Sequence, residues 1–154
     1  MSTANLDKFN EKRVDLHSHT NYSDGGLSPQ TLIDRAINFQ IDVLAITDHD
    51  TVSALDIAQH YIDDNQLPIT LVPGIEVSTL WQNFEIHVVG LNIDPSNIAL
   101  KELIGKQQTS REQRAKEIGA KLEKCGIGGI YEQALALANN GSVTRAHFAK
   151  VMLQ

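Results

Sequence analysis

The sequence lacks the features of several protein classes. It has one cysteine, Cys125, among 154 residues, so the chain cannot form an internal disulfide, and a single thiol suits a reducing compartment. No apolar run approaches the roughly 18 residues that span a bilayer. The first residues, as far as Arg13, are polar, unlike a secretory signal peptide. We therefore expect a cytoplasmic protein that does not enter a membrane.

The sequence also lacks an excess of basic residues. Lysine and arginine number 13 against 19 acidic residues, which gives a formal net charge of −6. This charge disfavours a broad electrostatic surface for long nucleic acid, but it does not exclude a small nucleotide or a short RNA held in a pocket. Hydrophobic residues make up 42% of the chain and charged residues 21%, as in globular domains.

The first 95 residues alternate predicted strands and helices. Strand-like runs occur at residues 14–17, 43–47, 69–72 and 84–91. Helical patterns lie between the first three runs, and one of them begins with Ser28 as its N-cap and Pro29 as its first position. This order predicts an α/β fold with parallel strands and helices outside. From Ser96 onward strand signals are few, and we expect helices.

Side chains of the types that bind metal ions occur where these strands end: His17, His19, Asp48, His49, Glu76 and His87. Because the carboxyl ends of parallel strands meet at one rim, we expect these side chains to lie close together. His17 and His19 are two positions apart, so they leave one face of the strand and can share an ion. Asp24 lies in the following loop, within reach of a neighbouring ion.

Mixed imidazole and carboxylate ligands suit zinc, iron or manganese better than calcium. Ions roughly 3.5–4 Å apart activate water and clamp phosphoryl oxygens, so no protein nucleophile is required. Asp15 has two interpretations. It accepts a hydrogen bond from a ligating imidazole, or it pairs with the backbone or with a basic residue such as Arg13.

Several longer runs resemble a known family. VDLHSHTNYSDGGLSPQTLIDRA, AITDHDTVSAL, VPGIEVST and EIHVVGL occur in this order and are similar to the motifs of the PHP (polymerase and histidinol phosphatase) superfamily of phosphoesterases. VTRAHFAKVM also looks like a family element. The resemblance is strongest to the bacterial branch of 3′,5′-nucleoside bisphosphate phosphatases and a 5′→3′ exoribonuclease of short RNA.

The resemblance implies the N-terminal part of a distorted (β/α)7 TIM-like barrel, with a tail at residues 1–12, a barrel segment at 13–95 and a helical insertion at 96–154. It implies two or three divalent ions, with manganese expected and zinc or iron as alternatives. His17, His19 and Glu76 would share one ion, Glu76 would bridge to a second ion bound by His87, and a third would take the remaining pair, Asp24 and His49.

The chain departs from the family pattern after the insertion begins. Family members supply a further histidine and a late Asp-x-His pair, and neither follows here. We therefore expect incomplete coordination shells, uncovered apolar faces, weak or no hydrolase activity from this chain alone, and an oligomer as one way to cover those faces.

The remaining polar residues admit two interpretations each. Arg145 and His147 begin a predicted helix, where an arginine and free N–H groups can hold a substrate phosphate; the alternative is a solvent-facing turn. The basic residues of the long helix after Ser96 alternate with glutamates, which favours a solvated, salt-bridged face.

The leading hypothesis for function is a metal-dependent phosphoesterase for a nucleoside 3′,5′-bisphosphate or the 5′ end of short RNA. The alternatives are a histidinol-phosphatase-like phosphomonoesterase and a non-catalytic PHP accessory module. Filled ligand positions argue against the last of these.

Overall fold

The computed structural model describes residues 12–138 and 141–153. The predicted tail therefore lies outside the described residues except for Lys12, as does Gln154 at the end of the predicted insertion. The elements follow in the order β1 (Val14–Asp15), α1 (Pro29–Asn38), β2 (Val43–Ile46), α2 (Ser53–Asp64), β3 (Thr70–Trp81), β4 (Phe84–Leu91), α3 (Ile98–Lys124), α4 (Ile130–Ala138) and α5 (Arg145–Met152).

The strands form one sheet in the order β1-β2-β3-β4. β1, β2 and β3 are parallel, as predicted, and β4 is antiparallel to β3. Two predicted strand ends were wrong. β1 stops at Asp15, so His17 and His19 stand in the loop that follows it rather than on a strand.

The second correction concerns β3, which continues through Pro73 and Gly74 as one strand, so Glu76 lies in its middle. Gly74 allows this because a Cβ there would lie 2.7 Å from Thr47 Cγ2 and 2.9 Å from the Ile46 carbonyl oxygen. A glycine at this position lets β3 stay paired with β2 without a break.

A tight hairpin turn joins β3 to β4. Gln82 and Asn83 both have positive φ angles, 49° and 70°, as a two-residue turn matched to the twist of the strands requires. The turn sets the register in which Ser78 pairs with His87. His87 therefore lies in the middle of an antiparallel strand, not at the carboxyl end where the sequence placed it.

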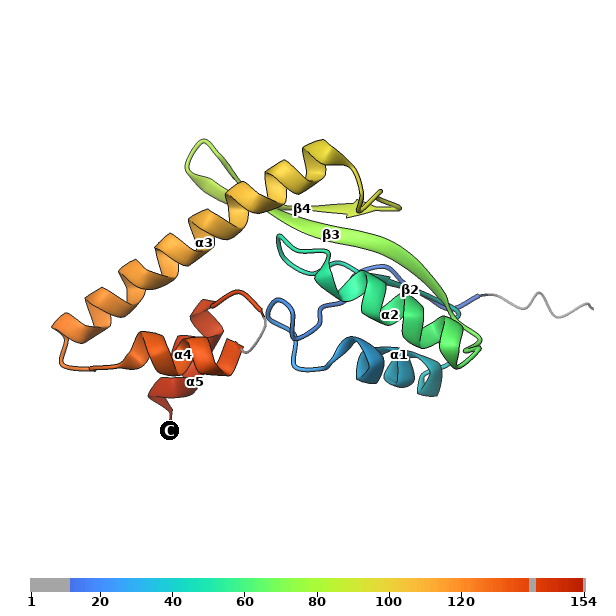
Figure 1. Ribbon diagram of the computed structural model, residues 1–154, viewed down its shortest axis with the longest axis horizontal. Helices are drawn as coiled ribbons and strands as arrows, with labels where there is room; N and C mark the ends of the chain where they lie inside the picture. Colours follow the sequence, from blue (N-terminus) through green and yellow to red (C-terminus); the bar gives the residue numbers. More distant parts are fainter. Residues whose placement is uncertain (1–11, 139–140, 154) are drawn as a thin grey trace, which may run out of the picture.

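Helices α1 and α2 pack side by side against the sheet and enclose the first core (Figure 1). α1 begins as predicted, with the Ser28 hydroxyl accepting a hydrogen bond from the Thr31 N–H and Pro29 in the first turn. The core joins both helices to the two central strands through the residues Ile33, Ala36, Leu44, Ile46, Ala54, Leu55, Ala58, Ile62 and Ile69.

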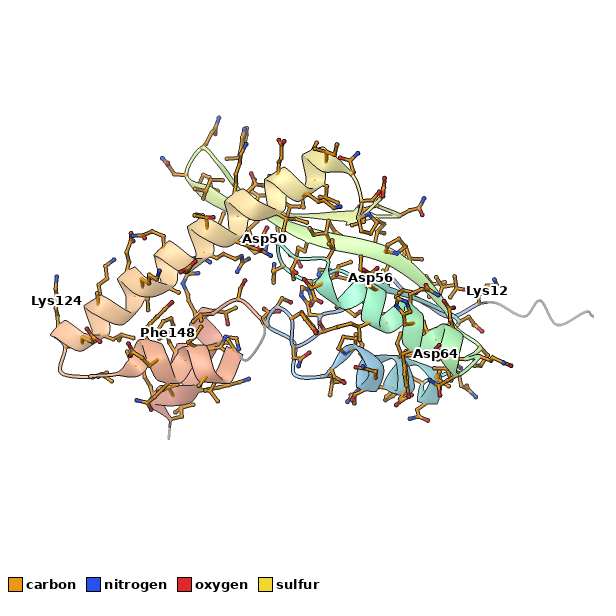
Figure 2. All side chains as sticks on the ribbon, viewed as in Figure 1. Lys12, Asp50, Asp56, Asp64, Lys124 and Phe148 are labelled. Carbon is orange, nitrogen blue, oxygen red and sulfur yellow. The ribbon has the colours of Figure 1, made fainter. Side chains whose placement is uncertain are left out.

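The helices α3, α4 and α5 follow Asn97, as predicted. The Asn97 side chain caps α3 by accepting a hydrogen bond from the Leu100 N–H. α3 crosses the sheet and runs on to α4 and α5, which pack beneath its far half (Figure 1). Ala115, Ile130, Ala134 and Phe148 form a second core there, and Figure 2 shows Phe148 between these helices. None of the helices in the described ranges has the length and apolar character for crossing a membrane.

Candidate metal centre

The structure brings all six predicted ligand residues into one cluster. His17, His19 and Asp24 come from the loop between β1 and α1, and His49 directly follows β2. β3 and β4 deliver the other two members, Glu76 and His87. The imidazoles form a continuous row, in which successive ring centroids are 5.1, 4.8 and 4.9 Å apart.

Glu76 lies at the centre of the cluster. Its Oε2 atom is 2.8 Å from His17 Nε2 and 3.1 Å from His19 Nε2, while its Oε1 atom is 3.2 Å from His87 Nδ1. The two carboxylate oxygens therefore face different imidazoles, which is the arrangement a bridging carboxylate needs.

Asp24 and His49 complete the cluster on its other side. Asp24 Oδ1 is 3.3 Å from His19 Nδ1, and Asp24 Oδ2 is 3.7 Å from His49 Nε2. Asp24 is exposed, whereas His49 is partly buried. Asp24 thus presents its carboxylate from the solvent side of the imidazole row.

The donor atoms form three overlapping groups, each with its atoms within 4.8 Å of one another. The groups are His17–His19–Glu76, His19–Asp24–His49 and His49–Glu76–His87. The first group is the set that the family resemblance implies for one ion. The other two groups contain the implied pairs, Asp24 with His49 and Glu76 with His87, and each has one further residue, His19 and His49 respectively. Nitrogen and carboxylate oxygen donors at this spacing fit divalent transition metals.

Protonation at the centre also suits metal binding, which requires neutral imidazoles and ionised carboxylates. Burial lowers the pKa of His49 below its ordinary value, although the charges of Glu76 and Asp24 oppose the shift. Burial alone would raise the pKa of Glu76, but the hydrogen bond from His17 and the charges of His49 and His19 outweigh burial, and its pKa is lowered. Near neutral pH, Glu76 therefore carries its charge and His49 is largely neutral.

Asp48 is a buried residue whose contacts the sequence did not reveal. Its side chain is 1% exposed. It accepts hydrogen bonds of 2.6 Å from the Thr20 N–H, the Thr20 hydroxyl and the Ser23 hydroxyl. The carboxylate therefore joins the end of β2 to the loop that carries His19 and Asp24.

Asp50 makes a second buried contact, this one to α3. Its Oδ1 atom accepts the Ser78 N–H at 2.9 Å, and Oδ2 lies 2.5 Å from Arg111 Nε. Arg111 also donates through Nη2 to the Ser78 hydroxyl at 2.7 Å. Figure 2 shows Asp50 where α3 crosses the sheet. The sequence predicted that the basic residues of α3 lie on a solvated, salt-bridged face. This prediction is confirmed for Lys116, which pairs with Glu112, and it was wrong for Arg111, whose side chain is 10% exposed.

Arginines line a cavity beside the imidazoles. The cavity has a volume of about 200 Å³, and its walls include Asp24, His49, His87, Arg111, Arg114 and Arg145. Glu85 stands among them, 3.3 Å from Arg114 and 3.8 Å from Arg145. The hydrogen bond from Arg114 lowers the pKa of Glu85. The cavity thus combines the candidate ligands with cationic groups suited to a phosphate.

Of the two predicted phosphate residues, Arg145 faces this cavity and His147 has a structural contact. His147 Nδ1 accepts a hydrogen bond from the Thr144 N–H at 3.0 Å, so it caps the first turn of α5. A phosphate role for His147 stays a prediction.

Asp15 pairs in register with Leu44, a core residue on the helix side of the sheet. Its side chain lines a cavity beside α1 together with Leu32 and Arg35. Its Oδ1 atom accepts the His17 N–H at 3.2 Å, which agrees with the backbone-pairing interpretation. The predicted bond from Asp15 to an imidazole is not among the contacts of the described residues.

The sequence profile of the PHP domain family matches residues 15–145. The chain belongs to the PHP domain family. The match extends past residue 95, so the PHP profile includes both the sheet and most of the helices that follow it.

Curated PHP relatives share close sequence similarity with this chain. The 5′-3′ exoribonuclease Rnm of Salmonella typhimurium is 48% identical over 140 residues, which are 91% of this chain and 48% of the relative. The 3′,5′-nucleoside bisphosphate phosphatase of Chromobacterium violaceum is 38% identical over 138 residues, 89% of this chain and 48% of the relative. The chain thus spans about half the length of the curated relatives it matches.

Solved PHP-fold structures agree with this assignment. An amidohydrolase from Chromobacterium violaceum, with sulfate bound and no metal, superposes with a TM-score of 0.83 at 37% identity, covering 92% of this chain and 49% of that one. A protein from Bifidobacterium adolescentis, described as a metal-dependent phosphoesterase, also gives a TM-score of 0.83 at 25% identity, with coverage of 93% and 50%. The fold is the N-terminal part of the PHP barrel, as predicted.

Proposed function

We propose that this chain is the N-terminal part of a metal-dependent phosphoesterase acting on a nucleotide. The substrate is a nucleoside 3′,5′-bisphosphate or the 5′ end of a short RNA. The observation that carries the proposal is the shared use of Glu76, His19 and His49 by three donor groups, directly beside an arginine-lined cavity.

The donor set supports two or three divalent ions, held by His17, His19, Asp24, His49, Glu76 and His87. Bound metals would activate a water and polarise the phosphoryl oxygens. Manganese is the ion we expect, with zinc or iron as alternatives, because imidazole and carboxylate donors accept all three. The hydroxyls of Thr20 and Ser23, which lie between His19 and Asp24 in the sequence, donate to Asp48, so neither is poised as a nucleophile.

The cationic side chains of the cavity would position the substrate. Arg114 and Arg145 both lie within 4 Å of Glu85 and are partly or largely exposed, so they are free to turn towards an anion. Arginine binds phosphate through two parallel N–H bonds. Arg111 is fixed by Asp50 and Ser78, and its charge is balanced by the Asp50 carboxylate. A second phosphate or a downstream RNA phosphate would occupy this arginine cluster.

The alternative functions predict different ligands. A histidinol-phosphatase-like enzyme would bind a phosphate monoester whose other end is a cation, whereas the exposed Arg114 and Arg145 suit a ligand with a second anionic group. An accessory module would have lost metal ligands, whereas this chain retains six. The relatives that act on nucleotides also favour the nucleotide hypothesis.

Binding and turnover together test this function. The chain is stripped of metal with a chelator and resupplied with Mn²⁺, and adenosine 3′,5′-bisphosphate and histidinol phosphate are compared as ligands by calorimetry. We expect Mn²⁺-dependent binding that favours the bisphosphate, and phosphate release slower than that of the Chromobacterium violaceum bisphosphate phosphatase. Tighter binding of histidinol phosphate would support the alternative enzyme. Binding and release that do not depend on metal would contradict the proposal.

A further inference from the structure

Asp48 is a buried carboxylate without a cationic partner among the described residues. Burial of an ionised carboxylate is costly unless hydrogen bonds replace its lost hydration. Three donors at 2.6 Å fill that role here. Such bonds to a charged acceptor are short and strong. All three come from Thr20 and Ser23, so the contact joins Asp48 to one short segment of chain.

That segment carries two of the candidate metal ligands. His19 directly precedes Thr20, and Asp24 directly follows Ser23. Most other bonds of the segment are internal: the Ser23 and Gly25 N–H groups bond to the Thr20 carbonyl, the Tyr22 N–H bonds to the Thr20 hydroxyl, and the Asn21 N–H bonds to the Leu27 carbonyl. The Ser23 hydroxyl is 3.4 Å from His19 Nδ1, and Ser18, which precedes His19, is bonded to β2 and Thr47. Because the turn closes on Thr20, fixing Thr20 fixes the whole turn. The bonds to Asp48 join residues 20–23 to the end of β2, so they contribute to the orientation of His19 and Asp24.

Asp48 also touches the rest of the centre through its backbone. Its carbonyl oxygen accepts the Glu76 N–H at 3.2 Å, and the Glu76 carbonyl accepts the Asp50 N–H at 3.0 Å. His49 lies between these two hydrogen bonds and forms an isolated parallel β-bridge with Glu76 through the backbone. Asp48 thus meets the loop through its side chain and β3 through its main chain.

We propose that Asp48 is a positioning residue that assembles the His19–Asp24–His49 group by holding the Thr20–Ser23 turn against the end of β2. This inference rests on the proposed metal centre, and it identifies a residue that holds one of the three donor groups together. The His49–Glu76–His87 group is built from backbone contacts of β2, β3 and β4, so it does not depend on the Asp48 carboxylate. His19 also belongs to the His17–His19–Glu76 group, so loosening the turn should weaken the ions held by His19 and Asp24 more than the ion held by His49, Glu76 and His87.

The test removes a donor and leaves Asp48 itself intact. Thr20→Val deletes the hydroxyl that bonds to Asp48 and keeps the side-chain shape. Thr51→Val is the matched control, because Thr51 is also buried and its hydroxyl also donates one bond and accepts one, but only within the α2 cap with Ser53. Ser23→Ala, alone and combined with Thr20→Val, removes the other hydroxyl donor. Mn²⁺ binding is measured from the electron paramagnetic resonance signal of the free ion. Thermal unfolding is recorded without metal.

We expect Thr20→Val to lower thermal stability at least as much as Thr51→Val, because the Thr20 hydroxyl donates to a buried carboxylate. Only Thr20→Val should weaken Mn²⁺ binding at the groups that contain His19 or Asp24, by about 10- to 100-fold, as losses of contacts behind metal ligands do, and the double variant should weaken these sites further while the His49–Glu76–His87 group keeps its affinity. Unchanged binding in the double variant, or equal loss in Thr51→Val, would overturn the positioning role. A wild-type chain that binds no Mn²⁺ would overturn the metal centre itself and this inference with it.

Discussion

Single side chains at the centre owe their protonation state to their immediate neighbours. Glu76 has a lowered pKa because the contacts from His17 and the neighbouring imidazoles outweigh its burial. Its charge in turn holds four imidazoles within 4 Å of its oxygens. Removing that one carboxylate would leave the histidines without their common partner, so Glu76 is the residue on which the geometry of the cluster most depends.

His147 allows a prediction about pH at the scale of one residue. Burial lowers its pKa below the ordinary value of 6.5, with a contribution from Lys150. The unfolded chain therefore takes up this proton first, and the stability contributed by His147 is present above pH of about 6.5 and lost as pH falls through the folded-state value. Glutamine keeps an acceptor for the Thr144 N–H and does not titrate.

We expect the wild type to lose more unfolding free energy than His147→Gln between pH 7.5 and 5.5. His147→Ala should lose about 1 kcal/mol at pH 7.5 through the missing cap. Urea unfolding at each pH measures these differences. Parallel pH curves for wild type and His147→Gln would show that His147 does not titrate as described.

At the scale of elements, the loop between β1 and α1 requires glycine at position 25 but not at position 26. A Cβ on Gly25 would overlap the His19 carbonyl oxygen and lie 2.8 Å from the Thr20 nitrogen, whereas a Cβ on Gly26 would meet nothing within 4 Å. Gly25→Ala should therefore displace Asp24. Because the loss of contacts that orient metal ligands weakens metal affinity, we expect Mn²⁺ binding to weaken by about tenfold or more. Gly26→Ala is the matched control. Equal Mn²⁺ affinity of both variants, measured by calorimetry, would contradict the close approach at Gly25.

The link between α3 and the sheet rests on a buried ion pair. Asp50 and Arg111 have side chains 1% and 10% exposed, and removing one partner of such a pair costs about 3–5 kcal/mol. Arg111→Met should lower the unfolding free energy by about that amount. The Asp50→Asn/Arg111→Met double variant should lose less than the sum of the two single losses, because the partners interact directly. Additive losses in urea unfolding would mean that the pair contributes little.

The sequence predicted elements whose signals are local. The capped start of α1 at Ser28 and the helices after Ser96 are examples. It failed where partners are distant along the chain. Nothing near Arg111 indicates a partner 61 residues away, so periodicity placed it on a solvated face.

The candidate ligands were predictable because metal-binding residue types stand at the ends of predicted strands. The residues that hold these ligands in place were not predictable. Asp48 precedes His49 in sequence, but its bonds to Thr20 and Ser23 depend on how the loop after β1 folds back. The end of β1 at Asp15 and the continuation of β3 past Glu76 likewise depended on pairing with neighbouring strands, which no local pattern carries.

For the whole molecule, the described chain is a four-stranded part of a PHP barrel. Apolar side chains of its outer strands remain exposed, among them Val14, Leu16, Val88 and Leu91. The curated relatives are about twice as long as the part matched. Three donor groups nevertheless come together from this part alone, so metal binding can be tested in this chain without reference to turnover.

The most direct test is the manganese content per chain after equilibration with Mn²⁺ and gel filtration, measured by atomic emission. The wild type is compared with a His17→Ala/His19→Ala variant, and circular dichroism checks that both are folded. The shared donor groups predict at least two ions per wild-type chain and at least one fewer in the variant. Equal metal content in the two folded proteins would contradict the proposed centre.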